Sequence, residues 1–188
     1  TIGGAVRGNA GAFGFEIKDF VTWVRALNTK TEDVREFSNA ECAFDYRMSF
    51  FKKNPEWIIL DVHLQLSESN PSQIDETIRE REKRHIQNVK AAGSFFMNPV
   101  APPAIVLMFE QEKSVTSRGG RVPAGWLIEK AGMKGAKLGG AQVSPQQANY
   151  IINADNATSE DVRELAQKVK EEVRRQFDVA LIEEAMIF

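Results

Sequence analysis

Cysteine and histidine are scarce in this sequence of 188 residues, which has one cysteine, Cys42, and two histidines, His63 and His85. A single cysteine cannot form a disulfide within the chain, and such usage is typical of a reducing compartment. The histidines and the cysteine lie far apart and lack the spacing of a zinc site, so we expect no bound metal. Cys42 is most simply interpreted as a small buried apolar side chain.

Long apolar runs and a strong net charge are also missing. The longest apolar run, around Ala104 to Phe109, is far shorter than the ~20 residues that cross a bilayer. There is no signal-peptide pattern. The 24 basic and 26 acidic side chains leave a formal charge of -2, which does not attract a polyanion. We therefore expect a cytoplasmic protein with neither nucleic acid nor membrane as a partner. The sequence does not indicate whether the protein is a monomer or an oligomer.

What is present is enough apolar material, 43% of the residues, for one sizeable core or two small ones. Strands and helices mix without regular alternation, which predicts the α+β class. The expected elements are strands at 17–27 and 57–66, a solvated helix at 71–88, strand plus loop at 102–123, helices at 124–131 and 158–177, and a closing strand at 179–188.

Two of these elements have detailed patterns. Residues 57–66 alternate as a half-buried strand, which predicts one face made of Ile58, Leu60, Val62, Leu64 and Leu66. The helix at 158–177 begins with Thr158 and Asp161 in a capping box. It continues with an apolar stripe made of Val162, Leu165, Ala166, Val169, Val173 and Phe177. Gly132 is expected to end the short helix at 124–131.

The first residues, TIGGAVRGNAGAFG, are rich in glycine, which permits positive φ and a close approach of a ligand. We interpret this segment, Thr1 to Gly14, as close-packed or ligand-facing. It opens without a methionine or any lead-in, so we expect that an upstream portion is missing.

Ser94 is the first candidate for chemistry, in the run Gly93-Ser94-Phe95-Phe96. Its hydroxyl, in a water-poor apolar setting, could donate a proton if another group polarised it. It could also be a nucleophile, although the G-x-S-x-G elbow is absent. The segment alone favours a third interpretation, a buried serine bonded to its own turn.

Three further clusters are weaker. Arg47, beside Tyr46, has the donor geometry for a carboxylate or phosphate, but a lone arginine is more often surface charge. Glu183 and Glu184 are adjacent, so in a strand at most one faces a site. The run of residues 144–149, SPQQAN, offers neutral amides suited to a sugar.

Taken together and in order, these segments resemble the MurB family of UDP-N-acetylenolpyruvoylglucosamine reductases. The resemblance rests on TIGGAVRGNAGAFG, ECAFDYR, AGSFFMNP, AGWLIEKAGMKG, GGAQVS, NYIINADNAT and the terminal glutamate segment. The serine signature AGSFFMNP is the most specific of these. The resemblance covers nearly the whole chain and implies the remainder of a flavin-binding domain at 1–66 and a substrate-binding domain at 67–188.

The resemblance also implies roles for individual residues. Ser94 would be the general acid, and Arg47 and Glu184 would polarise the substrate carboxylate. Tyr46, Asn98 and Gln147 would contact the nucleotide-sugar substrate. The backbone of Gly3, Gly4 and Ala5 would approach FAD, with NADPH as the reductant.

Two positions depart from the family pattern. Met97 stands where the family usually has lysine, and Met48 where an aspartate commonly follows tyrosine-arginine. The loss of the lysine, together with the missing first flavin subdomain, favours an alternative function, a non-catalytic nucleotide-sugar-binding module. The joint presence of Ser94, Arg47 and Glu184 favours the reductase, because a pure binder needs no proton donor.

Overall fold

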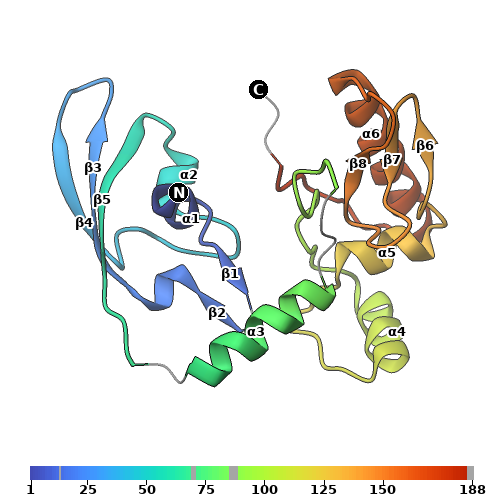
Figure 1. Ribbon diagram of the computed structural model, residues 1–188, viewed down its shortest axis with the longest axis horizontal. Helices are drawn as coiled ribbons and strands as arrows, with labels where there is room; N and C mark the ends of the chain where they lie inside the picture. Colours follow the sequence, from blue (N-terminus) through green and yellow to red (C-terminus); the bar gives the residue numbers. More distant parts are fainter. Residues whose placement is uncertain (13, 69–70, 85–88, 186–188) are drawn as a thin grey trace. The chain divides into compact units, whose positions relative to one another are not determined.

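The computed structural model of the chain describes residues 1–12, 14–68, 71–84 and 89–185. Helices and strands are mixed along the chain, so the predicted α+β class is confirmed (Figure 1). The chain forms two compact units, Thr1–Arg79 and Glu80–Phe188, and each is described by itself. Their division falls within α3 (Pro71–Arg84). The expected assignment of 1–66 to a flavin domain and 67–188 to a substrate domain stays a prediction.

The first unit is built on a three-stranded antiparallel sheet in the order β4-β3-β5. Its elements before α3 are α1 (Ile2–Arg7), β1 (Gly11–Ala12), β2 (Phe15–Glu16), the 3-10 helix η1 (Ile17–Asp19), β3 (Val21–Asn28), β4 (Val34–Ser38), α2 (Phe50–Lys53) and β5 (Trp57–Leu64). The buried core under the sheet consists of Val6, Val21, Val24, Ala26, Phe37, Cys42 and Phe51. Cys42 is 0% exposed, as expected of a small apolar side chain.

The strand expected at 17–27 begins later than predicted. Residues Ile17–Asp19 form a 3-10 turn, because the Asp19 carboxylate accepts a hydrogen bond from the Glu16 backbone N–H at 2.8 Å. This local cap competes with strand pairing for the same backbone groups. The strand proper, β3, then runs from Val21 to Asn28.

The predicted faces of β5 are wrong at its beginning. Arg25 pairs with Asp61 but its neighbour Ala26 pairs with Ile59, so Leu60 is an extra residue in a β-bulge. A bulge shifts the register by one and exchanges the two faces of the strand. Ile58 and Leu60 are consequently 52% and 48% exposed, whereas Ile59 joins the core. Val62 and Leu64 follow the predicted pattern, but the strand ends at Leu64, and Leu66 beyond it is 72% exposed.

In the second unit the last helix, α6, packs against a small antiparallel sheet of order β6-β7-β8, and α5 packs against α6 (Figure 1). After α3, its elements are α4 (Pro103–Lys113), α5 (Ala124–Lys130), β6 (Lys137–Leu138), β7 (Ala141–Val143), β8 (Ile151–Asn153) and α6 (Ser159–Phe177). The core includes Leu127 and Ile128 of α5, Val143 of β7 and Val169 of α6, all at most 1% exposed.

The helix predictions at 124–131 and 158–177 are confirmed. Thr158 Oγ1 accepts from the Asp161 N–H at 3.1 Å, and the Asp161 carboxylate accepts from the Thr158 N–H at 2.9 Å, which is the predicted capping box. The stripe of α6 supplies the buried residues Leu165, Ala166, Val169 and Val173. Gly132 has φ of 74°, the left-handed conformation expected after α5. The helix predicted at 71–88 is present as α3, and residues 85–88 lie outside the described residues.

Two predicted strands are absent from the described residues. The apolar part of 102–123 is the helix α4, in which Pro103 occupies a first-turn position that needs no N–H. Its apolar residues surround the helix, with Phe109 buried but Leu107 53% exposed, so no helical stripe was visible in the sequence. The closing strand at 179–188 is reduced to one bridge, between Phe96 and Glu183, and residues 186–188 lie outside the described residues.

Candidate functional site

In the first unit, Tyr46 and Arg47 form the tip of a tight turn. Asp45 and Met48 exchange two backbone hydrogen bonds of 3.0 Å across its base. Arg47 has φ of 54°, a left-handed conformation that costs a non-glycine residue about 1 kcal/mol or more. Its guanidinium carbon lies 5.6 Å from the centroid of the Tyr46 ring, so the two predicted site residues are in contact.

The Arg47 side chain reaches back to the glycine-rich segment. Its guanidinium donates to the carbonyl oxygen of Gly11 at 3.0 Å and to that of Asn9 at 3.4 Å. Lys52 Nζ donates to the Arg47 carbonyl at 2.9 Å and secures the turn from the other side. The structure therefore joins the arginine turn to the segment for which the resemblance implies flavin contacts.

Asn9 organises this arrangement, although no sequence pattern pointed to it. It is 0% exposed, and its Nδ2 donates to the Asp45 carbonyl at 2.9 Å and to Glu16 Oε2 at 3.1 Å. Its Oδ1 accepts from the Lys18 N–H at 3.3 Å. In the sequence, the segment GNAG was interpreted from its glycines alone. No local pattern predicted the contact of Asn9 with a residue 36 positions away.

Gly3, Gly4 and Ala5 lie in α1, which packs against β5. A Cβ at Gly3 would lie 3.7 Å from the Ile59 side chain, an ordinary contact. Gly4 is exposed, and a Cβ there would lie 3.3 Å from Thr1 Oγ1, which caps the Gly4 N–H at 3.1 Å. Gly4 is thus exposed in α1, and the flavin contacts expected of Gly3, Gly4 and Ala5 stay a prediction.

In the second unit, Ser94 lies between a glycine and two anchored phenylalanines. Gly93 has φ of 86°, and Phe95 and Phe96 are 5% and 1% exposed. Ser94 itself is exposed, so the expected water-poor setting is wrong for the described chain. The sequence pattern indicated apolar neighbours, but both rings turn into the core and leave the serine on the surface.

The predicted partner of Ser94 within this unit, Glu184, lies on the adjacent segment. The Glu184 N–H donates to the Phe95 carbonyl at 2.8 Å, and the Met97 N–H donates to the Ile182 carbonyl at 2.9 Å. The serine segment and the C-terminal segment are therefore paired side by side. Arg47 belongs to the other unit.

The neighbouring Glu183 has a different partner. Its carboxylate forms an ion pair of 2.9 Å with Lys170 Nζ of α6, and both side chains are about one-third exposed. This ion pair distinguishes the two adjacent glutamates, which the sequence alone did not. The Glu183 side chain binds α6, and the Glu184 backbone bonds the serine segment.

The predicted substrate residues Asn98 and Gln147 both lie at the beginning of α5. Asn98 Oδ1 accepts from the Ala124 N–H at 3.0 Å. A Cβ at Gly125, the second residue of the helix, would lie 3.2 Å from Gln147 Oε1. The Gln147 N–H is in turn held by the buried Ser144 hydroxyl at 3.2 Å. One helix terminus thus brings together two polar side chains that are 49 positions apart (147 minus 98).

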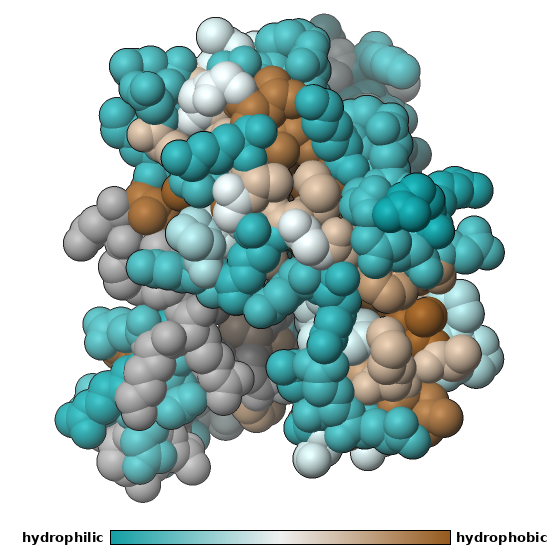
Figure 2. Space-filling model, turned by 90° about the vertical axis from the view of Figure 1, so that its right-hand side faces the viewer, coloured by the Kyte–Doolittle hydropathy of each residue, from teal (hydrophilic) through white to brown (hydrophobic). Residues whose placement is uncertain are grey.

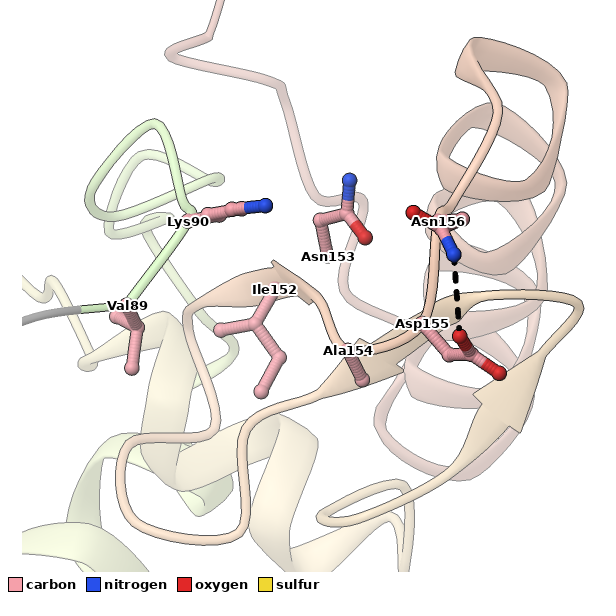
Figure 3. Close-up of a pocket in the computed structure, with 7 residues that line it drawn as sticks. All are labelled: Val89, Lys90, Ile152, Asn153, Ala154, Asp155 and Asn156. Carbon is pink, nitrogen blue, oxygen red and sulfur yellow. Dashed lines mark hydrogen bonds between the residues drawn. The ribbon is translucent and has the colours of Figure 1, made fainter.

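An open pocket of about 370 Å³ lies elsewhere in the second unit (Figure 3). Its lining consists of Val89, Lys90, Ile152, Asn153, Ala154, Asp155 and Asn156. In Figure 3 the Lys90 side chain points toward Asn153, while the Asp155 carboxylate points away from both. The lining contains none of the residues that the sequence analysis assigned to a site.

Among the residues that the structure describes, no helix combines the length and apolarity needed to span a bilayer. Those same residues contain no group of three or more metal-ligating side chains. The face drawn in Figure 2 is mainly hydrophilic, with apolar side chains gathered in small groups.

Comparison with known proteins defines the class first. Residues 84–188 match the family model described as UDP-N-acetylenolpyruvoylglucosamine reductase, C-terminal domain. The chain therefore belongs to the UDP-N-acetylenolpyruvoylglucosamine reductase (MurB) family, as its motifs predicted.

Individual relatives agree with this assignment. The reductase of that name from Carboxydothermus hydrogenoformans is 38% identical over 100% of this chain and 56% of its own length. The one from Solibacter usitatus is 34% identical over 97% of this chain and 59% of its own. The crystal structure of the reductase from Thermus caldophilus superposes with a TM-score of 0.73 at 27% identity, covering 100% of this chain and 60% of that one. The chain thus spans less than two thirds of the length of these relatives.

Proposed function

We propose that this chain carries catalytic and substrate-binding residues of a flavin-dependent reductase in peptidoglycan precursor synthesis. The reaction reduces the carbon-carbon double bond of UDP-N-acetylglucosamine enolpyruvate, forms UDP-N-acetylmuramate and oxidises NADPH to NADP⁺. The observation that carries the proposal is the backbone pairing of the Ser94 segment with Glu184, through the 2.8 Å bond to Phe95, in a chain of the reductase family.

The backbone of Gly3, Gly4 and Ala5 holds FAD in this proposal, and the exposed backbone at Gly4 supports it. FAD, when bound, supplies the hydride of NADPH to the methylene carbon of the substrate. Arg47 binds the substrate carboxylate as a fixed cation, because backbone carbonyls of the glycine-rich segment hold its guanidinium in place. Tyr46, which contacts Arg47, lies beside the same carboxylate.

Ser94 completes the reduction by donating a proton. Its O–H bond breaks as a C–H bond forms at the carbon next to the carboxylate, and water returns a proton to the serine oxygen. A serine hydroxyl is a weak acid, so the transition state needs electrostatic support, which we assign to Arg47 and Glu184. Asn98 and Gln147 bind the nucleotide-sugar from the beginning of α5, where their side chains lie.

The first experiment measures flavin binding by the purified 188-residue chain. FAD is added, excess is removed by desalting, and absorbance is recorded before and after anaerobic NADPH and then the enolpyruvyl substrate. Flavin that the chain retains, that NADPH bleaches and that the substrate restores would support the reductase. The control Ser159→Ala, an exposed serine in the first turn of α6, should behave as the parent.

Ser94→Ala tests the proton donor in the same assay. We expect normal bleaching by NADPH, normal substrate binding and re-oxidation slowed by about 10² to 10⁴, the usual contribution of a general acid. Unchanged re-oxidation would refute the assignment.

A second function is favoured by Met97, which stands at the position of the usual family lysine and carries no charge. In this alternative the chain binds the nucleotide-sugar without redox chemistry. A chain that binds the enolpyruvyl nucleotide with micromolar affinity, but stays colourless after desalting from FAD, fits this alternative or a reductase that holds FAD only with the part of its relatives that this chain does not span.

A further inference from the structure

The side-chain amide of Asn149 bonds the segment that follows Ser94 through both its oxygen and its nitrogen. It is 7% exposed; its Oδ1 accepts from the Phe96 N–H at 3.0 Å and its Nδ2 donates to the Phe96 carbonyl at 2.9 Å. Its own carbonyl accepts from the Phe95 N–H at 2.7 Å. A carboxamide that bonds both the N–H and the C=O of one residue acts as a short strand neighbour, because donor and acceptor are presented together.

The opposite side of the same segment is also bonded. The Phe95 carbonyl accepts from the Glu184 N–H at 2.8 Å, and the Met97 N–H donates to the Ile182 carbonyl at 2.9 Å. The backbone groups of Phe95 and Phe96 are therefore all bonded, to Asn149 on one side and to the C-terminal segment on the other.

Ser94 lies at the edge of this anchored stretch. Gly93, which precedes it, has φ of 86°, and a Cβ there would meet no atom within 4 Å among the residues described. Gly93 thus has open space beside it, whereas the residues directly after Ser94 are bonded on both sides, so these bonds help to fix the direction of the Ser94 Cα–Cβ bond. The bonds of Asn149 are the side-chain contribution to that anchoring.

We infer that Asn149 is a positioning residue, which orients the Ser94 hydroxyl for proton donation; this inference rests on the proposed function. Asn149 does not contact the substrate in this scheme, although it belongs to the amide-rich run 144–149 that suggested sugar binding. Its side-chain amide forms hydrogen bonds within the protein. Gln147, which belongs to the same run, lies at the beginning of α5.

Asn149→Asp tests the inference with the smallest change of shape. The carboxylate still accepts from the Phe96 N–H but has no donor for the Phe96 carbonyl and repels that oxygen. The matched control is Asn156→Asp, an exposed asparagine of the same unit whose Nδ2 makes one long bond of 3.4 Å to Asp155.

Two readouts are needed. Amide hydrogen exchange, followed by NMR on the chain, should rise by about tenfold or more at Phe96 in Asn149→Asp and stay unchanged at Leu127 in the core. Rapid-mixing kinetics on the flavin-loaded chain then separate the half-reactions. We expect NADPH-driven reduction within about twofold of the parent, and substrate-driven re-oxidation at least about tenfold slower, with a larger solvent isotope effect.

The slowing of re-oxidation caused by Asn149→Asp should not add to the slowing caused by Ser94→Ala. If Asn149 acts through Ser94, Asn149→Asp placed in a Ser94→Ala chain should change re-oxidation by less than about twofold. Re-oxidation at the parental rate despite faster exchange at Phe96 would overturn the inference. So would an equal slowing of both half-reactions, because that is the signature of general damage to the fold.

Different results refute the inference and the proposed function. A parent chain that binds flavin but is not re-oxidised by the substrate refutes the proposed function, and the inference with it. A parent with full turnover, together with an Asn149→Asp variant of equal turnover, refutes the inference alone.

Discussion

Gly125, the second residue of α5, offers a prediction in which stability and substrate binding change in opposite directions. An added methyl group would lie 3.2 Å from Gln147 Oε1, 3.4 Å from the Asn149 nitrogen and 3.5 Å from Asn149 Cβ. The two contacts with Asn149 are close to ordinary van der Waals separation. The contact with Gln147 is too short by a few tenths of an ångström, and that oxygen is at the end of a rotatable side chain.

For Gly125→Ala we therefore expect the fold to gain stability. Replacing glycine by alanine within a helix stabilises by roughly 0.5–1 kcal/mol, because glycine loses more backbone entropy on folding. In the proposed function, displacing the Gln147 amide would remove at most one neutral hydrogen bond to the nucleotide-sugar, worth about 0.5–1.5 kcal/mol. That loss corresponds to an affinity about 2- to 13-fold weaker.

The assays are urea unfolding followed by the fluorescence of Trp126, a residue of the same helix, and calorimetric titration with UDP-N-acetylmuramate. Gln147→Ala is the reference variant and should weaken binding by a similar factor without a gain of stability. In the double variant, Gly125→Ala should cost no further affinity, because the group it displaces is already gone.

The reasoning is refuted if Gly125→Ala binds like the parent while Gln147→Ala does not. In that case the glutamine accommodates the methyl group without leaving its binding position. A loss of more than about 1 kcal/mol in stability would instead show that Asn149, which cannot rotate away, is the atom group that the methyl strikes.

The remaining predictions concern stability and reactivity. Thr158→Ala removes the hydroxyl cap of α6 and should cost about 0.5–2 kcal/mol in urea unfolding followed by circular dichroism; an unchanged midpoint would contradict the capping role. Hydrogen bonds from the Thr158 and Gly140 N–H groups lower the pKa of Asp161 below its ordinary 3.8, so its contribution to stability is present above that value and lost as the pH falls through the lowered pKa. The stability difference between the parent and Asp161→Asn should therefore shrink on acidification below that range, and a difference that grew would contradict the assignment. Burial raises the pKa of the Cys42 thiol to about 11, so a disulfide reagent at neutral pH should react with it only after urea unfolds the chain, and rapid reaction of the native chain would show that this core opens.

Elements with strong local signals were predicted well from the sequence. The helix α6 carried both its cap and its stripe, and α5 ended where Gly132 permits the left-handed conformation. These features depend on residues within one or two turns of each other. Their physical cause is therefore readable without any tertiary structure.

Elements decided by distant neighbours were predicted poorly. The faces of β5 are exchanged by a bulge at Leu60, which exists only because β3 pairs beside it. The helix α4 carries apolar side chains around its circumference, so its periodicity did not reveal it. The C-terminal segment has strand composition but makes one bridge, to Phe96, among the residues described.

The sequence by itself determined the class of the fold, the family and the residue types available for chemistry. Ser94, Arg47 and Glu184 were predicted to act in chemistry from the motifs that contain them, because a motif preserves local order. Only the tertiary structure decided what holds them: Arg47 on the carbonyls of Asn9 and Gly11, and the Ser94 segment between Asn149 and Glu184. The bonds of Arg47 and of the Asn149 side chain reach backbone groups 36 to 53 positions away, and the Glu184 N–H bonds the Phe95 carbonyl still farther along the chain. Any residue can supply the peptide, so no sequence pattern marks the partner, and the contact exists only once the chain has folded.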